Sequence, residues 1–227
     1  MKSAVCLLSG GLDSATALYL AQNEGYSAKA LTVRYGQRHE KEIEAAAAIA
    51  AVLSIEHYVM KIGLPWGGSS LLDISMPLPL GRNEKEMANS IPSTYVPARN
   101  SIFLTIAASY AEAIGAAAIF IGANALDYSG YPDCRPEYFE AFEAAMRLGT
   151  KQGVEGNPLR IKKPLLKLTK KEIIELGNSL GVPFEKTWSC YQGEDKPCGR
   201  CDSCLLRAKG FREAGIEDPL MTVPASV

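Results

Sequence analysis

This sequence lacks any long hydrophobic run and has very little histidine. No apolar stretch in its 227 residues reaches the roughly 20 residues of a membrane-spanning helix, so we expect no membrane partner. The two histidines, His39 and His57, belong to no recognisable Ser/His/Asp or Cys/His set of nucleophilic catalysis. A net charge of −1 lacks the positive excess that is typical of nucleic-acid binding, so we expect small-molecule partners and no nucleic acid.

Composition is ordinary for a globular chain, with 47% hydrophobic and 22% charged residues. The length allows one sizeable α/β domain with a small appendage, but not two full enzymes. The first predicted strand follows the start at once, without the charged and apolar regions of a secretory signal peptide. We therefore expect a cytoplasmic location, where clustered thiols bind metal more often than they form disulfides.

Cysteine is clustered near the end of the sequence. Four of the six cysteines follow the spacing C-x7-C-x2-C-x2-C, namely Cys190, Cys198, Cys201 and Cys204. Four thiolates complete the tetrahedral coordination of Zn²⁺ and leave no position for water, so this spacing predicts a structural zinc ion. An Fe–S cluster is the alternative, because it also uses four thiolates. Cys6 lies within an apolar run and is expected to pack in the core.

The stretch Ser9–Ser14 reads Ser-Gly-Gly-Leu-Asp-Ser and joins the apolar run Ala4–Leu8 to a predicted helix that starts near Ala15. A small-residue turn between a strand and a helix directs backbone N–H groups and the positive helix end at one point, which suits a phosphate. The Lys of a Walker A loop is absent. Asp13 would repel phosphate by itself and therefore suggests a Mg²⁺ ion between them. The simpler alternative is a plain turn that uses Gly-Gly for its dihedrals.

Apolar and helical segments alternate along the chain, which predicts a doubly wound parallel sheet. The remaining predicted strands are Ser27–Val33, Ile55–Ile62, Ala116–Ile121 and Leu159–Lys163. The remaining predicted helices are Glu40–Leu53, Ser101–Ile114, Glu137–Leu148 and Thr169–Leu180, the last with a capping box at its start.

Two long loops are candidate parts of a binding site. Gly63–Pro97 is rich in Pro, Gly and Ser, and is either a lid over a site or a surface excursion. It ends beside Arg99 at a helix entrance, a natural place to meet an anion. Gly122–Pro136 holds tyrosines that can stack on a flat ring and aspartates that can accept from a guanine-like edge. A solvated polar loop is the alternative, and Cys134 within it has either a packing or a functional role.

Ser-Gly-Gly-x-Asp-Ser resembles the phosphate-binding motif of the N-type ATP pyrophosphatases, which adenylate an acceptor and release pyrophosphate. Four further segments resemble one family among them, the 7-cyano-7-deazaguanine synthases of queuosine biosynthesis. These segments are Arg34–His39, Val96–Asn100, Gly122–Arg135 and Thr187–Tyr191 running into the cysteines. The resemblance covers nearly the whole chain and implies an adenine nucleotide alpha hydrolase-like fold with a C-terminal zinc-binding segment.

The resemblance also implies the reaction. ATP activates 7-carboxy-7-deazaguanine, ammonia gives the amide, and a second activation of the amide gives the nitrile 7-cyano-7-deazaguanine (preQ0), with AMP and pyrophosphate released. A homodimer is implied too. A tRNA-thiolating ATP pyrophosphatase is the alternative function, which should bring a basic face and free catalytic cysteines. The single domain leaves no space for a glutaminase, so free ammonia is the expected nitrogen source.

Residue roles follow from the same resemblance. The catalytic residues are expected to be Asp13, Ser14 and Arg99, with Lys163 a further candidate for balancing phosphate charge. The expected nucleotide contacts are Leu8, Ser9, Gly10, Gly11, Leu12, Asp13, Ser14, Ala15, Thr16, Ala17 and Leu18. The expected deazaguanine contacts are Tyr128, Tyr131, Asp133 and Arg135. The expected organisation is a pyrophosphatase domain at 1–186, a zinc-binding segment at 187–218 and a loose tail at 219–227.

Overall fold

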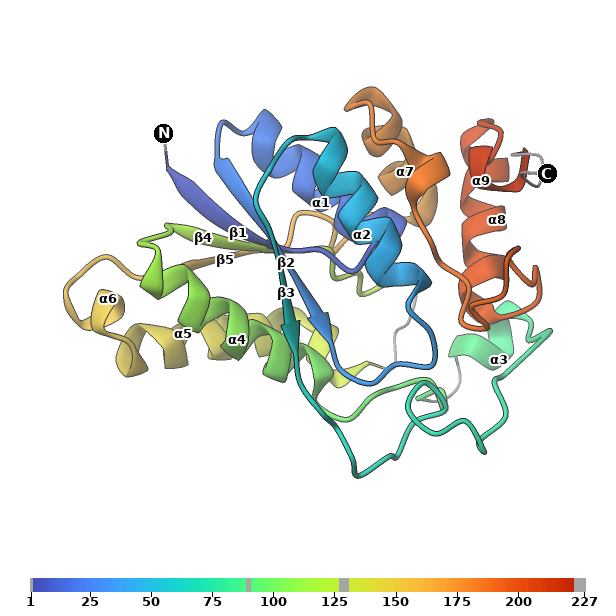
Figure 1. Cartoon of the computed structure of the whole chain (residues 1–227), viewed down its shortest axis with the longest axis horizontal. Coiled ribbons are helices and arrows are strands. Elements are labelled where there is room, and N and C mark those ends of the chain that lie inside the picture. Colours follow the sequence, from blue (N-terminus) through green and yellow to red (C-terminus); the bar gives the residue numbers. More distant parts are fainter. Residues whose placement is uncertain (1, 89–90, 127–130, 223–227) are drawn as a thin grey trace.

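The computed structural model describes residues 2–88, 91–126 and 131–222, and its centre is a five-stranded sheet. All neighbouring strands are parallel, in the order β3-β2-β1-β4-β5 (Figure 1). The strands are β1 (Ser3–Leu7), β2 (Ser27–Arg34), β3 (His57–Lys61), β4 (Ala118–Ile121) and β5 (Arg160–Lys162). The predicted doubly wound α/β fold is therefore confirmed. The chain reverses its direction of strand addition between β1 and β4, and ligands of such sheets bind at that point.

Helices cover both faces of the sheet (Figure 1). They are α1 (Leu12–Asn23), α2 (Lys41–Val52), α3 (Glu84–Ala88), α4 (Arg99–Ala113), α5 (Pro136–Gly149), α6 (Lys151–Val154), α7 (Lys170–Ser179), α8 (Asp202–Ala214) and α9 (Pro219–Thr222). Helices α1, α2 and α7 pack on one face, while α4 and α5 pack on the other. Alternate residues of β1 enter the two cores, Cys6 on the first side and Val5 on the second. Burial on both sides explains why the strand is an unbroken apolar run.

Helix α7 begins as its sequence predicts. Thr169 accepts from the backbone of Glu172, and the Glu172 side chain bonds back to the backbone of Thr169, which completes the capping box. Helix α8 has no counterpart among the predicted elements. Its buried positions include Asp202, Arg207 and Gly210, so it lacks the apolar period that reveals most helices.

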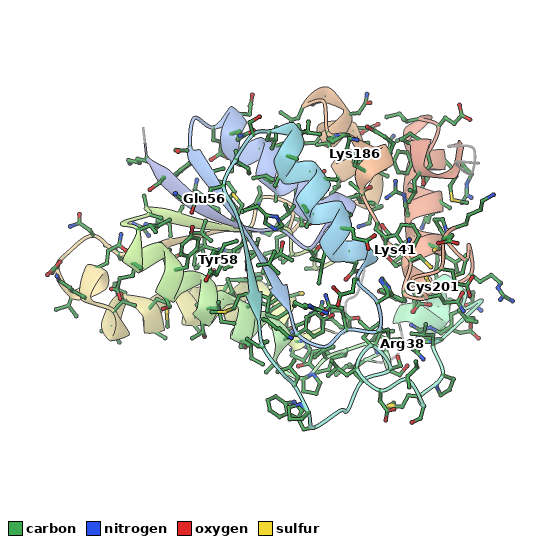
Figure 2. The ribbon with its side chains drawn as sticks, viewed as in Figure 1. Arg38, Lys41, Glu56, Tyr58, Lys186 and Cys201 are labelled. Carbon is green, nitrogen blue, oxygen red and sulfur yellow. The ribbon has the colours of Figure 1, made fainter. Side chains whose placement is uncertain are left out.

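The long loop between β3 and α4 packs against the sheet instead of standing away from it. Leu64, Leu71 and Val96 are buried with Val33 at the end of β2. Arg38 fastens the loop further, because its guanidinium donates to three backbone carbonyls, those of Ser70, Ile74 and Met76. Figure 2 labels Arg38 beside this loop. The loop therefore forms one rim of the space above the sheet; whether it opens and closes as a lid stays a prediction.

The C-terminal segment joins the main domain closely. Arg207 of α8 is buried and pairs with Asp218 through two contacts of 2.7 and 2.8 Å. The same guanidinium donates to Phe184 O of the main domain at 3.1 Å, and Trp188 N donates to Gly10 O at 2.9 Å. The tail begins with the short helix α9, and residues 223–227 lie outside the described residues. No helix in the described part of the chain has the length and apolar character to cross a bilayer.

Candidate active site

The turn from β1 into α1 is shaped for close approach. Gly10 has φ +88°, and a Cβ on it would lie 2.0 Å from the carbonyl oxygen of Glu42 in α2, so no side chain fits there. Ser14 Oγ accepts from Ser9 N at 3.1 Å and donates to Gly11 O at 3.0 Å, which fixes the loop. No side chain caps the start of α1. Its first N–H groups are thus available to an anion.

A cavity of about 270 Å³ opens above this loop. Its lining includes six of the expected nucleotide contacts, which are Leu8, Ser9, Gly11, Leu12, Asp13 and Ser14. The other five lie behind the surface. Gly10 packs on α2, Ala15, Ala17 and Leu18 belong to the core, and Thr16 donates to the carbonyl of Leu12 at 2.8 Å.

Asp13 meets a partner from far along the chain. Lys170, the first residue of α7, places its Nζ 2.8 Å from both carboxylate oxygens of Asp13. Both residues line the cavity. The lysine therefore brings a positive charge to the Ser9–Ser14 loop. Lys163, the cation that the sequence suggested, lies instead 5.9 Å from the ring centre of Phe139 and is absent from the cavity lining.

The cavity lining also carries Arg99 and two tyrosines, Tyr35 and Tyr131. Arg99 Nη1 donates to Tyr35 Oη at 3.4 Å, and its guanidinium carbon lies 6.0 Å from the Tyr35 ring centre. Tyr131 also lines the cavity, with its Oη 3.1 Å from Thr94 Oγ1 and its ring 5.6 Å from that of Tyr95. Burial raises the pKa of Tyr35 above its ordinary value, so the phenol stays protonated at neutral pH. This part of the lining can hold an anion and a flat ring.

The remaining expected substrate contacts are placed differently. Asp133 is buried, and its Oδ2 accepts from Asn100 N at 3.0 Å, which joins the loop to the first turn of α4. Arg135 is exposed and precedes α5. Tyr128 lies outside the described residues. Cys134 lines the cavity, but burial raises the pKa of its thiol to about 12, so it stays a neutral thiol.

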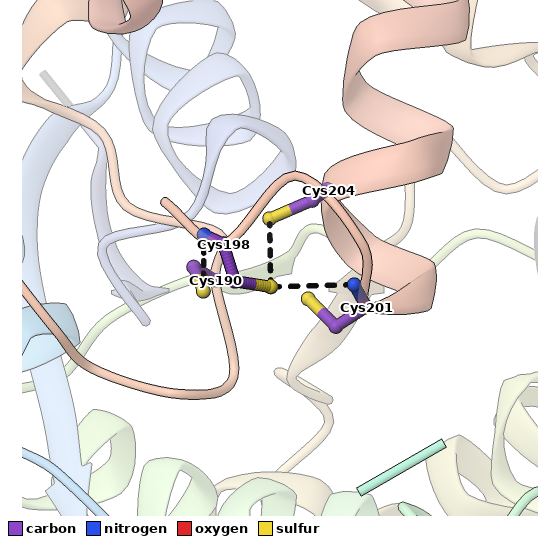
Figure 3. Close-up of side chains that lie close together, drawn as sticks. All are labelled: Cys190, Cys198, Cys201 and Cys204. Carbon is purple, nitrogen blue, oxygen red and sulfur yellow. Dashed lines mark hydrogen bonds between the residues drawn. The ribbon is translucent and has the colours of Figure 1, made fainter. Parts of the chain in front are cut away.

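The four clustered cysteines converge on one point (Figure 3). Their sulfur atoms all lie within 4.8 Å of one another, and Cys198 Sγ is 4.0 Å from Cys204 Sγ. A tetrahedral zinc site has sulfur atoms about 3.8 Å apart. Backbone N–H groups of Cys198 and Gln192 also donate to Cys190 Sγ, at 3.3 and 3.4 Å, as is common around thiolates. All six cysteines are free of disulfides. The cluster can therefore hold a metal, as the sequence predicted.

A family model described as "Queuosine biosynthesis protein QueC" matches residues 3–215. The chain belongs to the QueC family. It is 55% identical to the 7-cyano-7-deazaguanine synthase of Trichodesmium erythraeum, over 96% of this chain and 99% of that one. It is 54% identical to the synthase of Thermoplasma acidophilum, over 96% of this chain and 91% of that one. These matches confirm the synthase family that the sequence motifs indicated.

Solved structures agree on the fold at lower identity. A 4-thiouridine synthetase bound to RNA and ATP aligns with a TM-score of 0.51 at 21% identity, over 97% of this chain and 52% of that one. An NMN synthetase from Francisella tularensis aligns with a TM-score of 0.50 at 20% identity, over 99% of this chain and 79% of that one. At this identity the likeness shows the fold alone. The QueC match itself decides against the tRNA-thiolating alternative.

Sequence reasoning missed two charged residues of the site, Lys170 and Glu42. Lys170 follows a helix cap, and nothing near it in the sequence signals a contact with Asp13, 157 residues away. Glu42 resembles any acidic residue in the first turn of a helix. Their places in the cavity follow only from the fold, which brings α2 and α7 to the Ser9–Ser14 loop.

Proposed function

We propose that this chain converts 7-carboxy-7-deazaguanine and ammonia into 7-cyano-7-deazaguanine, with two ATP molecules consumed at a single site. The observation that carries the proposal is the continuity of the cavity, which is lined by the phosphate loop at Ser9–Ser14 and by Arg99 and Tyr131. A nucleotide on the loop and an acid held by Arg99 would share that space. The names of the curated relatives give the product.

The chemistry fits these residues. A carboxylate is a poor electrophile, and transfer of AMP to one of its oxygens creates a good leaving group. Ser9 and Ser14 hydroxyls and the N–H groups at the start of α1 would hold the departing pyrophosphate. Asp13 would orient the magnesium that accompanies ATP, with Lys170 beside it adding a positive charge to the same end of the cavity. Arg99 would hold the acid group of the substrate.

Tyr131 is the member of the expected deazaguanine set that can face the ring directly, because it lines the cavity and leans on Tyr95. Asp133 and Arg135 would act without touching the ring. Asp133 accepts a hydrogen bond from Asn100, the neighbour of Arg99 in sequence, and Arg135 precedes α5. The cysteine cluster would hold a structural zinc ion, since all four of its ligand positions would be filled by protein sulfur.

The homodimer and the cytoplasmic location belong to the same proposal. Strand β3 forms one edge of the sheet and exposes Val59, Met60 and Tyr58, of which Tyr58 is labelled in Figure 2. An exposed apolar edge strand favours pairing with another chain. Sedimentation equilibrium should give twice the chain mass, and a Tyr58→Lys variant tests whether this edge is the interface.

The function is tested by incubating purified protein with ATP, Mg²⁺, ammonium and 7-carboxy-7-deazaguanine. The mass of the product is then measured by mass spectrometry. The proposal predicts the nitrile, with about two AMP per product as two activations require. An Asp13→Ala variant should form neither, while Asp195→Ala, whose carboxylate is fully exposed, should act as wild type. Formation of AMP without the nitrile, or no acid-dependent AMP at all, would overturn it.

A further inference from the structure

Glu42 occupies a place in the cavity that the reaction so far leaves without a role. It is the second residue of α2, and its side chain lines the cavity. Its own carbonyl oxygen lies against Gly10 of the phosphate loop. The side chain therefore starts beside the phosphate loop and lines the same cavity as Ser9, Gly11 and Ser14, where phosphate would bind.

The carboxylate of Glu42 has no hydrogen bond or ion pair with any other described residue (2–88, 91–126 and 131–222), whereas Asp13 in the same cavity is held by Lys170. Three charged or titratable groups face it from neighbouring elements: Arg99 from α4, Tyr35 beyond β2 and Cys190 before α8. The Arg99 guanidinium lies beyond ion-pair distance from the Glu42 carboxylate. A carboxyl group and a guanidinium group thus line one cavity without forming an ion pair with each other.

We propose that Glu42 is the base that takes protons from the nitrogen substrate. At neutral pH most ammonia is present as ammonium. Ammonium has no lone pair with which to attack, so it must first lose a proton. That proton would pass to the Glu42 carboxylate. The freed lone pair forms the C–N bond to the activated carbon, and the C–O bond to AMP breaks with its electron pair leaving on the AMP oxygen. The nitrogen, now bonded to the carbonyl carbon, loses a second proton to solvent, which leaves the neutral amide.

The second half of the reaction needs a base at the same position. Once the amide oxygen carries AMP, the nitrogen must lose its remaining protons while the C–O bond breaks and the carbon–nitrogen triple bond forms. Between the steps Glu42 would return its proton to solvent. Burial raises the pKa of Glu42 to about 7, against the smaller opposing effect of the Arg99 charge, which suits a base that works near neutral pH.

The charges in the cavity suggest how the reactants are arranged. Arg99 would hold the acid group, and Glu42 would hold ammonium on the other side of the reacting carbon. A guanine-like N–H edge would also suit a carboxylate. That edge lies at the far end of the substrate from its acid group, however, whereas Glu42 lies beside the phosphate loop. Position therefore favours ammonium.

This inference rests on the proposed function, and two assays keep their failures apart. Activation of the acid precedes the use of ammonia, so the wild type should exchange labelled pyrophosphate into ATP in the presence of the acid alone. Glu42→Gln should keep this exchange but lose about 10²- to 10⁴-fold in kcat/KM for ammonium. Its residual rate should rise with pH in proportion to free ammonia.

Glu42→Asp keeps a carboxylate and should recover part of the ammonium-dependent rate. Glu44→Gln, an exposed position on the same helix, should behave as wild type. If Glu42→Gln loses the acid-dependent exchange, Glu42 acts on ATP, metal or the deazaguanine, and the inference is overturned. Retention of the wild-type kcat/KM for ammonium also overturns it. Absence of exchange in the wild type contradicts the proposed function instead.

Discussion

Lys170 Nζ lies 2.8 Å from each carboxylate oxygen of Asp13, which joins the first turns of α7 and α1. The pair lies at the mouth of the phosphate loop and lines the cavity. An ammonium group there would attract the negative charge of ATP and pyrophosphate, and it fixes the direction of the Asp13 carboxylate. The contact thus connects the phosphate loop to a helix that belongs to the last third of the chain.

Replacing Lys170 with Met should lower kcat/KM for ATP by about 10- to 100-fold, the effect of losing one hydrogen bond to a charged group. The methionine keeps the length and apolar stem of the lysine, so the fold should persist. Steady-state kinetics with varied ATP would measure the loss. Lys171→Met is the matched control, since its side chain is exposed and pairs with Glu175 on the same helix. Equal kinetics for the two variants would contradict the assigned role.

Removing the Asp133 carboxylate should destabilise the protein before any substrate is added. Asp133→Ala leaves the partly buried N–H of Asn100 without its acceptor, which should lower the free energy of unfolding by about 1–3 kcal/mol. A melting curve of the ligand-free protein measures this loss. An unchanged melting temperature combined with a large rise in KM for the acid would show that Asp133 contacts substrate instead.

The stability of the protein should depend on pH through Glu42. Burial raises its folded-state pKa to about 7, above its unfolded value, so the folded protein holds an extra proton between these two values. Stability present at lower pH is therefore lost as pH rises to about 7. Glu42→Gln should remove this loss and be more stable at pH 8 by about 1–3 kcal/mol, with a smaller gain at pH 5. Melting temperatures of both proteins across this range provide the test, and an equal gain at both pH values would contradict it.

The cysteine cluster should hold one zinc ion per chain. Metal analysis should find zinc without iron, and the protein should lack the visible absorption of an Fe–S cluster. Cys201→Ser should release the metal and lower the melting temperature by roughly 10 °C, as expected for a loss of several kcal/mol in a chain of this size. Cys6→Ala, outside the cluster, should retain the metal. Iron in the purified protein would favour the alternative that the spacing left open.

Much of the fold follows from local patterns, because buried parallel strands are apolar runs and the helices between them have caps. The phosphate loop and the cysteine cluster could also be predicted from the sequence, since the residues of each are close together in the chain. Helix α8 could not be predicted from an apolar pattern, because its buried positions include the charged residues Asp202 and Arg207. Asp202 is paired with Arg82, and Arg207 is paired with Asp218. The contact between Lys170 and Asp13 depends on strand order, which no local pattern encodes.

In the proposed reaction, one site activates the carbon of the acid twice. The most direct measurement uses substrate with ¹⁸O in both carboxylate oxygens and follows the label by mass spectrometry. Each activation moves one of these oxygens onto AMP, so both AMP molecules released per nitrile should carry one ¹⁸O, with none in water. Label in only one of the two AMP molecules, or its release to solvent, would contradict the account.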